Sequence, residues 1–143
     1  MNIKKFIGAA FAVFVAIQVT DAIIHGAILG KTYMAMENVW RADMMSKMWI
    51  MRVTSLIFAL LFVYIFSKGY EGKGVIEGIR FGIIIGFLMN VVGVLNQYVI
   101  YPVPFTIIVQ WFGFGMLQFI IYGIIVALIY KPIQNAEQIN LAE

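Results

Sequence analysis

The sequence predicts an all-α membrane protein with four transmembrane helices in an antiparallel up-down bundle. Hydrophobic residues make up 63% of its 143 residues, charged residues only 12%, and the mean hydropathy is +0.95. A soluble domain is about 45–50% apolar and about 25% charged, and a soluble chain of this size has too much surface to hide so many apolar side chains. The apolar runs are continuous and do not alternate with a period of two, which excludes a β-barrel.

Four apolar runs predict the four spans, and polar or proline-containing segments separate them. A helix crosses a hydrocarbon core of about 30 Å with about 20 residues. We therefore expect one domain, residues 1–143, with spans at about 6–30, 48–66, 75–100 and 105–130.

The segments between the runs justify these limits in order. The first run follows Lys4 and Lys5 and is longer than the apolar region of a typical signal peptide, so we interpret it as a span. Residues 31–47 form a long loop, and the segment SKGYEGKG after the second run is rich in glycine and charge. The third connection contains Pro102 and Pro104, which cannot continue a helix.

The distribution of lysine and arginine predicts that both termini are cytoplasmic, because positive charge is enriched on that side of a membrane. This topology places six basic residues inside: Lys4, Lys5, Lys68, Lys73, Arg80 and Lys131. It leaves four outside: Lys31, Arg41, Lys47 and Arg52.

A ladder of glycines at intervals of four residues predicts close helix packing in the third span. It consists of Gly74, Gly78, Gly82 and Gly86, and Asn90 continues the same stripe. Small residues on one face let another helix approach the backbone closely. The favoured partner is a helix of the same chain. The alternative is a homodimer, in which Asn90 would form a hydrogen bond across the interface that contributes about 0.6–2 kcal/mol.

Polar side chains from all four spans predict one layer in the outer half of the membrane: Asp21, His25, Arg52, Asn96, Gln97 and Gln110. Intramembrane polar residues are costly and are therefore functional candidates. We expect Asp21 and Arg52 to pair, because an unpaired aspartate at mid-span costs about 2.5–3.5 kcal/mol. Two interpretations remain open: an outward-facing pocket for a substrate, an ion or a proton, and a buried salt bridge that only fixes helix register.

Two further titratable features lie toward span ends. His25 belongs to the residue type that titrates near neutral pH. Glu77 and Arg80 are three residues apart at the start of the third span, which predicts an ordinary ion pair at a helix end.

The long loop and the start of the second span are rich in methionine, including Met34, Met36, Met44 and Met48. Thioethers are soft ligands that select Cu(I), so a soft-metal site is one interpretation. Tyr33, Trp40 and Trp49 lie in the same region. Aromatic residues anchor segments at membrane interfaces, and packing in the interface is the favoured interpretation.

Several function classes find no support. The chain has no cysteine, which removes thiolate chemistry and cysteine-ligated metals, and no basic run indicates nucleic acid. Motifs for phosphate binding, dinucleotide binding or hydrolysis are missing. An enzyme is therefore the minority interpretation, and no cofactor is predicted.

The segments IHGAILGKTY, VWRADMMSKMW and KGYEGKGVIEGIRFG resemble uncharacterised four-span proteins of the bacterial inner membrane. The recurring positions would be His25, Gly26, Trp40, Arg41, Gly69, Tyr70, Glu71, Gly72, Glu77 and Gly78. The resemblance covers nearly the whole chain but implies architecture only, because no activity is attached to that group.

The sequence thus leaves two functions open. The first is a small membrane binding or transport module whose outward-facing pocket is built from the polar layer. The alternative is a structural or accessory subunit of a larger membrane complex, which would meet its partners through the glycine ladder and the methionine-rich loop.

Overall fold

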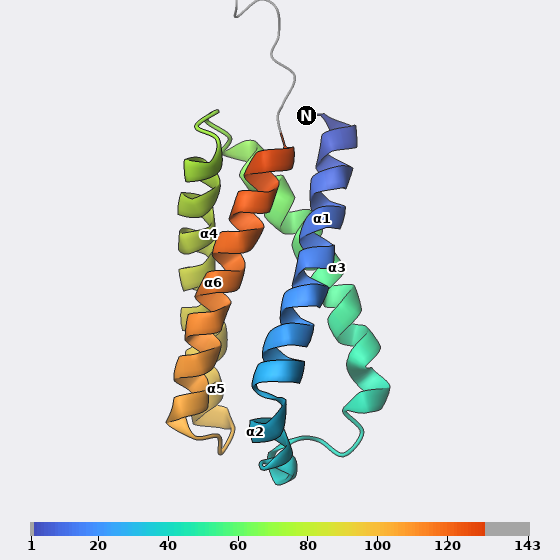
Figure 1. The fold of residues 1–143 in the computed structure, drawn as a ribbon, viewed down its shortest axis with the longest axis vertical. Helices are drawn as coiled ribbons and strands as arrows, with labels where there is room; N and C mark the ends of the chain where they lie inside the picture. Colours follow the sequence, from blue (N-terminus) through green and yellow to red (C-terminus); the bar gives the residue numbers. More distant parts are fainter. Residues whose placement is uncertain (1, 131–143) are drawn as a thin grey trace, which may run out of the picture.

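The computed structural model describes residues 2–130, which form a bundle of long helices that run up and down in turn (Figure 1). Four helical segments are long and apolar enough to cross a membrane: Ile3–Ile28, Met45–Lys68, Val75–Ile100 and Phe105–Ile129. No strand occurs within residues 2–130. The predicted all-α fold with four spans is confirmed.

The first and third spans each change from α-helix to π-helix. Both changes occur in the C-terminal part of the span, which lies in the half of the bundle opposite the N terminus. Helix α1, Ile3–Asp21, continues as the π-helical segment Ala22–Ile28 and then as the short helix α2, Gly30–Met34. Such segments are rare in helices and occur frequently at functional sites.

The remaining helices follow in chain order. Short 3₁₀ turns at Glu37–Val39 and Met45–Lys47 lead into α3, Met48–Lys68. Helix α4, Val75–Met89, continues as the π-helical segment Asn90–Val94 and as α5, Leu95–Ile100, before α6, Phe105–Ile129.

The glycine ladder of α4 packs against α6. A Cβ atom added to Gly78 would lie 2.8 Å from the carbonyl carbon of Gly123, and one on Gly82 would lie 2.9 Å from that of Phe119. A Cβ on Gly86 would lie 2.7 Å from the Cβ of Phe119. Real Cβ atoms do not approach other atoms this closely. The two backbones can therefore touch only because glycine, which has no side chain, occupies these positions. The ladder is an intramolecular contact, as the favoured interpretation predicts.

The two ends of the expected stripe behave differently. Gly74 has a φ of +67° and precedes α4, and nothing lies within 4 Å of a Cβ placed there. Asn90 is only 3% exposed, but its amide donates to the carbonyl of Gly86 in its own helix, at 2.7 Å, and its side chain packs against Gly115. Because α6 covers Gly78, Gly82 and Gly86, a second copy of the chain would have to use another surface.

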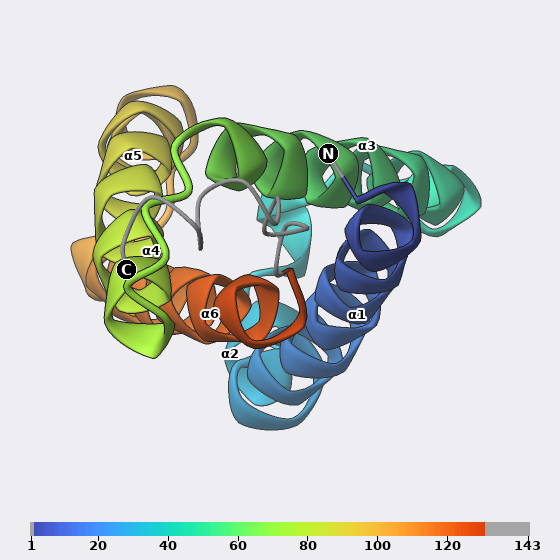
Figure 2. The same cartoon turned by 90° about the horizontal axis from the view of Figure 1, so that it is seen from above.

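The hydrophobic core fills the half of the bundle that contains the N terminus. Helices α1, α3 and α6 supply it, and in the view from above α1 lies beside both α3 and α6 (Figure 2). Its members are Ala9, Ala10, Val13, Ile17, Ala59, Phe62, Val63, Phe66, Tyr122, Val126, Ala127 and Tyr130. In the other half, α3 diverges from α4 and α6 (Figure 1), and every residue from 48 to 57 except Ser55 is exposed.

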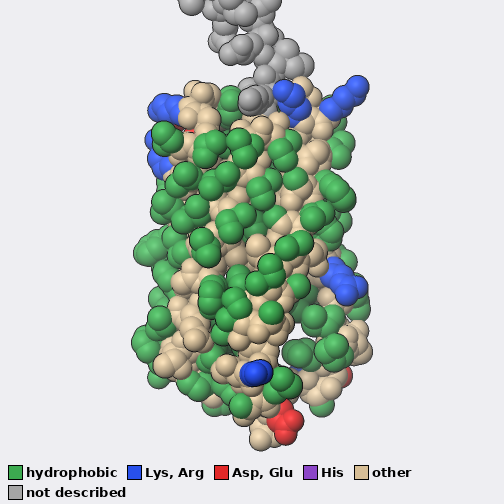
Figure 3. All heavy atoms as spheres, in the orientation of Figure 1, with side chains coloured by type: hydrophobic (Ala, Val, Ile, Leu, Met, Phe, Trp, Pro, Cys, Tyr) green, Lys and Arg blue, Asp and Glu red, His purple; other side chains and the backbone are tan. Residues whose placement is uncertain are grey.

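The surface matches a chain immersed in lipid. Hydrophobic side chains cover the middle of the face drawn in Figure 3, and Lys and Arg gather at the end with the N terminus. A soluble monomer rarely exposes so large an apolar area.

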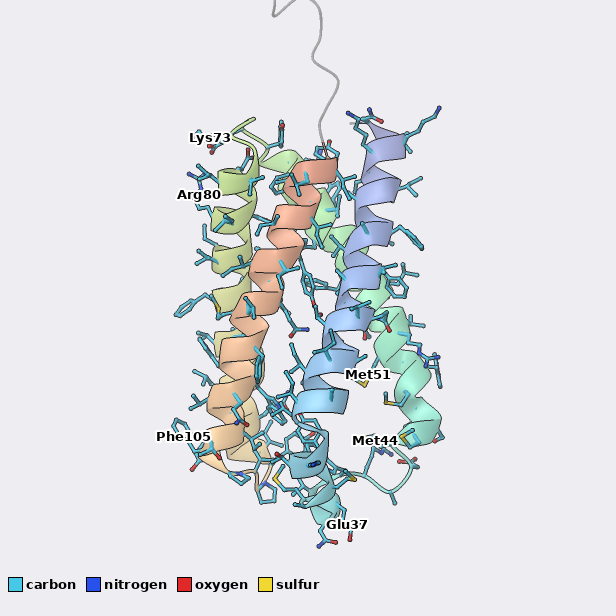
Figure 4. The ribbon with its side chains drawn as sticks, viewed as in Figure 1. Glu37, Met44, Met51, Lys73, Arg80 and Phe105 are labelled. Carbon is cyan, nitrogen blue, oxygen red and sulfur yellow. The ribbon has the colours of Figure 1, made fainter. Side chains whose placement is uncertain are left out.

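The loop before α4 is organised by Glu77, which corrects the predicted ion pair. Glu77 is 5% exposed, and its two carboxylate oxygens accept the backbone N–H groups of Glu71 at 2.7 Å and Lys73 at 2.9 Å. Arg80 instead donates to the Glu71 carboxylate at 3.1 Å, and Lys73 pairs with Glu71 at 2.5 Å. Lys73 and Arg80 lie at the beginning of α4 (Figure 4). The expected Glu77–Arg80 pair is wrong because the buried carboxylate caps the loop.

Candidate functional site

A polar network joins α1 to α6 near the middle of the bundle. The side-chain nitrogen of Gln118 lies 2.8 Å from the Asp21 carboxylate, 2.9 Å from the Thr20 hydroxyl and 3.0 Å from the Tyr122 hydroxyl. The Thr20 and Tyr122 hydroxyl oxygens lie 2.8 Å apart. Gln118 is 9% exposed and Tyr122 3%, so the network is largely shielded. It holds Asp21 in a defined position between two helices.

An open cavity of about 270 Å³ lies beside this network. All four spans contribute to its wall: Ile17, Asp21, Thr54, Ser55, Phe58, Met89, Gln118, Phe119 and Tyr122. Ile17 and Tyr122 also belong to the hydrophobic core. The cavity therefore begins where the core ends, on the side where α3 diverges from α4 and α6.

The polar wall on α3 consists of two neighbouring hydroxyls. Thr54 donates to the carbonyl oxygen of Met51 at 2.9 Å, and Ser55 donates to the same oxygen at 2.7 Å. These bonds leave the oxygen lone pairs of both side chains as acceptors.

Asp21 has no cationic partner, which overturns the predicted pair with Arg52. Within residues 2–130, no lysine, arginine or histidine nitrogen lies within 4.0 Å of its carboxylate, and the ion pairs involve only Asp43 and Glu71 as acids. Arg52 is exposed on the divergent half of α3. A long basic side chain there can extend its charge toward the interface, so matched depth along two helices does not make two residues neighbours.

His25 belongs to a separate cluster at the end of the bundle away from the N terminus. Its Nδ1 lies 2.6 Å from the Tyr33 hydroxyl, which also accepts from Trp111 Nε1 at 2.6 Å. Trp40 Nε1 donates to the Tyr33 carbonyl at 3.1 Å. Burial raises the pKa of Tyr33, and the hydrogen bond from Trp111 opposes this shift. The Tyr33 hydroxyl therefore stays protonated near neutral pH and connects α2 to the π-helical segment Ala22–Ile28 and to α6.

The other predicted members of the polar layer do not reach the cavity. Asn96 is exposed and donates to the carbonyl of Val92 in its own helical turn, at 2.8 Å. Gln97 is half-buried and Gln110 is exposed, and neither lines the cavity. Of the six predicted residues, only Asp21 contributes to its wall. The layer is several separate polar groups.

The methionine-rich segment lies at the end of the molecule away from the N terminus, where Met44 precedes α3 and Met51 lies in its first turn (Figure 4). Met34, Met44 and Met48 are exposed, and Met36 is half-buried. In the part of the chain that the structure describes, no group of three His, Cys, Asp or Glu side chains is placed to hold a metal. A soft-metal site formed by methionines remains a prediction.

Charges in the same loop are paired locally. Asp43 interacts with Arg41 at 2.6 Å and with Lys47. These two partners, Lys47 first, lower the pKa of Asp43. Asp43 is therefore ionised near neutral pH.

The residues that complete the site were not predicted. Gln118 lies in the middle of the fourth apolar run, where a polar residue is itself a signal of function, and this signal was available in the sequence. Thr20, Thr54 and Ser55 give no such signal, because hydroxyls in a membrane helix usually bond to their own backbone. Only the packing of α1 against both α3 and α6 brings them close to Asp21 and Gln118.

A second cavity, of about 260 Å³, has an almost wholly apolar wall: Leu95, Phe105, Ile108, Val109, Phe112 and Gly113. It contains no side chain that could orient a polar ligand. The cavity at Asp21 is therefore the better candidate for a binding site.

Comparisons of the chain with protein-family models, with curated proteins and with solved structures find no match. A function for this chain rests on the geometry of the cavity at Asp21.

Proposed function

We propose that the protein is a small binding or transport module of the bacterial inner membrane, with both termini cytoplasmic and the cavity at Asp21 open to the outside. One observation carries the proposal: an aspartate without a cationic partner among residues 2–130 lines an open cavity formed by all four spans.

The energetics favour a wet cavity. Removing an ionised carboxylate from water costs several kcal/mol unless a partner compensates, and Asp21 has only the neutral amide of Gln118. Water or a ligand must therefore supply the remaining interactions. The hydrophobic core closes the cavity on the side of the N terminus, so water would enter it from the side of the 31–47 loop.

The orientation in the membrane is supported by the charges at the two ends. The end with the N terminus carries Lys4 and Lys5, Lys68 at the end of α3, Lys73 in the following loop, and Arg80 near the start of α4. Under the positive-inside rule this end is cytoplasmic, and the opening of the cavity then faces outward.

Access to the cavity can be tested with a single cysteine, because the chain has none of its own. A membrane-impermeant thiol reagent applied from outside should label Ser55→Cys. The matched control is Leu61→Cys, which lies on the same helix but is 54% exposed on the apolar surface, and it should react slowly because lipid disfavours the thiolate. Equal rates for the two cysteines, or no labelling of Ser55→Cys, would contradict an outward-open cavity.

An accessory subunit is the second candidate, and the divergent half of α3 favours it. Residues 48–57 are exposed at all positions except Ser55, which leaves both apolar and polar side chains for a partner helix. Purification at native expression level separates the two functions: an accessory subunit should copurify with a larger membrane protein in a fixed ratio, whereas a binding module should not.

A further inference from the structure

Resting on the proposed function, we infer that the cavity at Asp21 binds a small organic ammonium ion, with its charged group at the Asp21 carboxylate and its alkyl group against Phe58, Phe119 and Tyr122. The inference combines three observations: where the hydrogen-bond donors of the wall point, which acceptors remain, and what the rest of the wall is made of.

The side-chain donors on α1 and α6 are already used by protein acceptors. The Thr20 hydroxyl donates to the Ala16 carbonyl at 2.8 Å, so Tyr122 is the donor in its bond with Thr20. The two amide hydrogens of Gln118 are shared among Asp21, Thr20 and Tyr122. None of these groups has a hydrogen left for a ligand.

The donors on α3 are used as well. The hydroxyl hydrogens of Thr54 and Ser55 both point to the Met51 carbonyl. What remains on the residues that line the cavity is a set of acceptors: the Asp21 carboxylate and the hydroxyl oxygens of Thr54 and Ser55. An anion would meet only acceptors and one negative charge, so the wall selects against it.

A ligand that satisfies this wall must donate several hydrogen bonds and carry a positive charge, which describes an ammonium group. Charge-assisted bonds to a carboxylate are about twice as strong as neutral ones, and a cation also relieves the cost of an unpaired intramembrane carboxylate.

The apolar part of the wall distinguishes an organic ammonium from a bare metal ion. Phe58, Phe119 and Tyr122 line the same cavity as Asp21, together with Met89. Aromatic faces attract organic cations by cation–π interaction, by about 0.5–2 kcal/mol. A cavity of about 270 Å³ is also larger than a single metal ion.

The test uses the full chain reconstituted in lipid nanodiscs in potassium phosphate buffer, with thermal unfolding and calorimetric titration as readouts. Four probes are compared: propylammonium, propan-1-ol, propionate and sodium. We expect a saturable rise in melting temperature with propylammonium alone. Asp21→Asn should weaken its binding about tenfold or more. Asp43→Asn, an exposed loop acid paired with Arg41 and Lys47, should leave its affinity unchanged.

The outcomes separate this inference from the proposed function. Equal stabilisation by propan-1-ol, propionate or sodium would show a cavity that binds ligands but would overturn the ammonium class. If no probe acts while Ser55→Cys is labelled, the cavity is open and the ammonium class is again wrong. If Ser55→Cys is not labelled, the proposed function fails first. The probe series on the wild type decides the matter even where Asp21→Asn does not fold, and Phe58→Leu should then weaken propylammonium binding.

Discussion

The side-chain amide of Gln118 donates to the carboxylate of Asp21 across 2.8 Å and so connects the fourth span to the first near the middle of the bundle. The bond is asymmetric in its chemistry. Asp21 carries the charge, whereas Gln118 supplies the contacts that hold the charge in place.

This asymmetry predicts different effects for the two obvious substitutions. Asp21→Asn retains an oxygen that can accept from Gln118, and Asp21 has no ion pair to lose, so the free energy of unfolding should change by less than about 1 kcal/mol. Gln118→Leu leaves an intramembrane carboxylate without its donor and should destabilise the protein by about 1–3 kcal/mol. Unfolding in detergent measures both. Arg52→Gln is the control, and a larger loss from Arg52→Gln or Asp21→Asn than from Gln118→Leu would restore the ion-pair interpretation.

The contact between α4 and α6 predicts intolerance of even one methyl group. Gly78→Ala and Gly82→Ala should each separate the helices and cost about 1–3 kcal/mol, because overpacking forces backbone shifts. Gly93→Ala is the matched control in the same span, since nothing lies within 4 Å of a Cβ there. Thermal unfolding compares the three. Equal melting temperatures for Gly78→Ala and Gly93→Ala would contradict the close contact.

The two hydrogen bonds accepted by Glu77 predict that its carboxylate holds the loop between α3 and α4 in place. Glu77→Ala removes the acceptor for the N–H groups of Glu71 and Lys73, so both amides should exchange hydrogen faster and the protein should lose about 1–3 kcal/mol. Glu77→Gln keeps one acceptor oxygen and should fall between the wild type and Glu77→Ala. Exchange measured by mass spectrometry on the loop peptide gives the readout, and unchanged protection in Glu77→Ala would show that the carboxylate does not hold the loop.

Glu71 predicts a pH dependence in the same loop. Its pKa is lowered from the ordinary value of 4.5 by Lys73 first and then by Arg80. A lowered pKa in the folded state means that the ionised form stabilises the fold above pH 4.5 and that this contribution is lost as the pH falls through the folded-state value. The stability difference between wild type and Glu71→Gln should therefore shrink on acidification. Denaturant unfolding at stepwise lower pH measures it, and a difference that grows on acidification would contradict the sign.

The hydrogen bonds of Tyr33 predict how much its cluster with His25 and Trp111 contributes to the free energy of unfolding. Tyr33→Phe removes the hydroxyl that contacts His25 and accepts from Trp111, and it should cost about 1–3 kcal/mol because a partly buried indole N–H loses its acceptor. Tyr98→Phe, at an exposed position, is the control for loss of a hydroxyl. Equal melting temperatures for the two variants would show that the cluster is not a structural connection.

The fold could be predicted from the sequence because its signals are local. Four long apolar runs define four helices whatever their arrangement, and the spacing of Gly78, Gly82 and Gly86 identifies a face of one helix. The partner of that face could not be read from α4 alone, although Gly123 on α6 supplies the complementary gap.

The site could be predicted only in part, because depth along a helix says nothing about direction around it. Asp21 and His25 are four residues apart, which puts them on one face of a regular α-helix. The π-helical segment Ala22–Ile28 changes the number of residues per turn, and His25 joins Tyr33 while Asp21 joins Gln118. The π-helical segment Asn90–Val94 likewise precedes Asn96 and Gln97, which do not reach the cavity.

One half of α3 is packed in the core and the other half is not, so the helix can tilt about the point where the core begins. Its second half is fixed by Ala59, Phe62, Val63 and Phe66 in the core, whereas residues 48–57 are almost wholly exposed. Met48 lies about 16 Å from Ala59 at 1.5 Å per residue, so a tilt of about 10° at this pivot displaces Met48 by about 3 Å. Thr54 and Ser55 lie close to the pivot and move much less. A tilt of this kind would change the distance between the first turns of α3 and the other spans more than the distance between its two hydroxyls and Asp21.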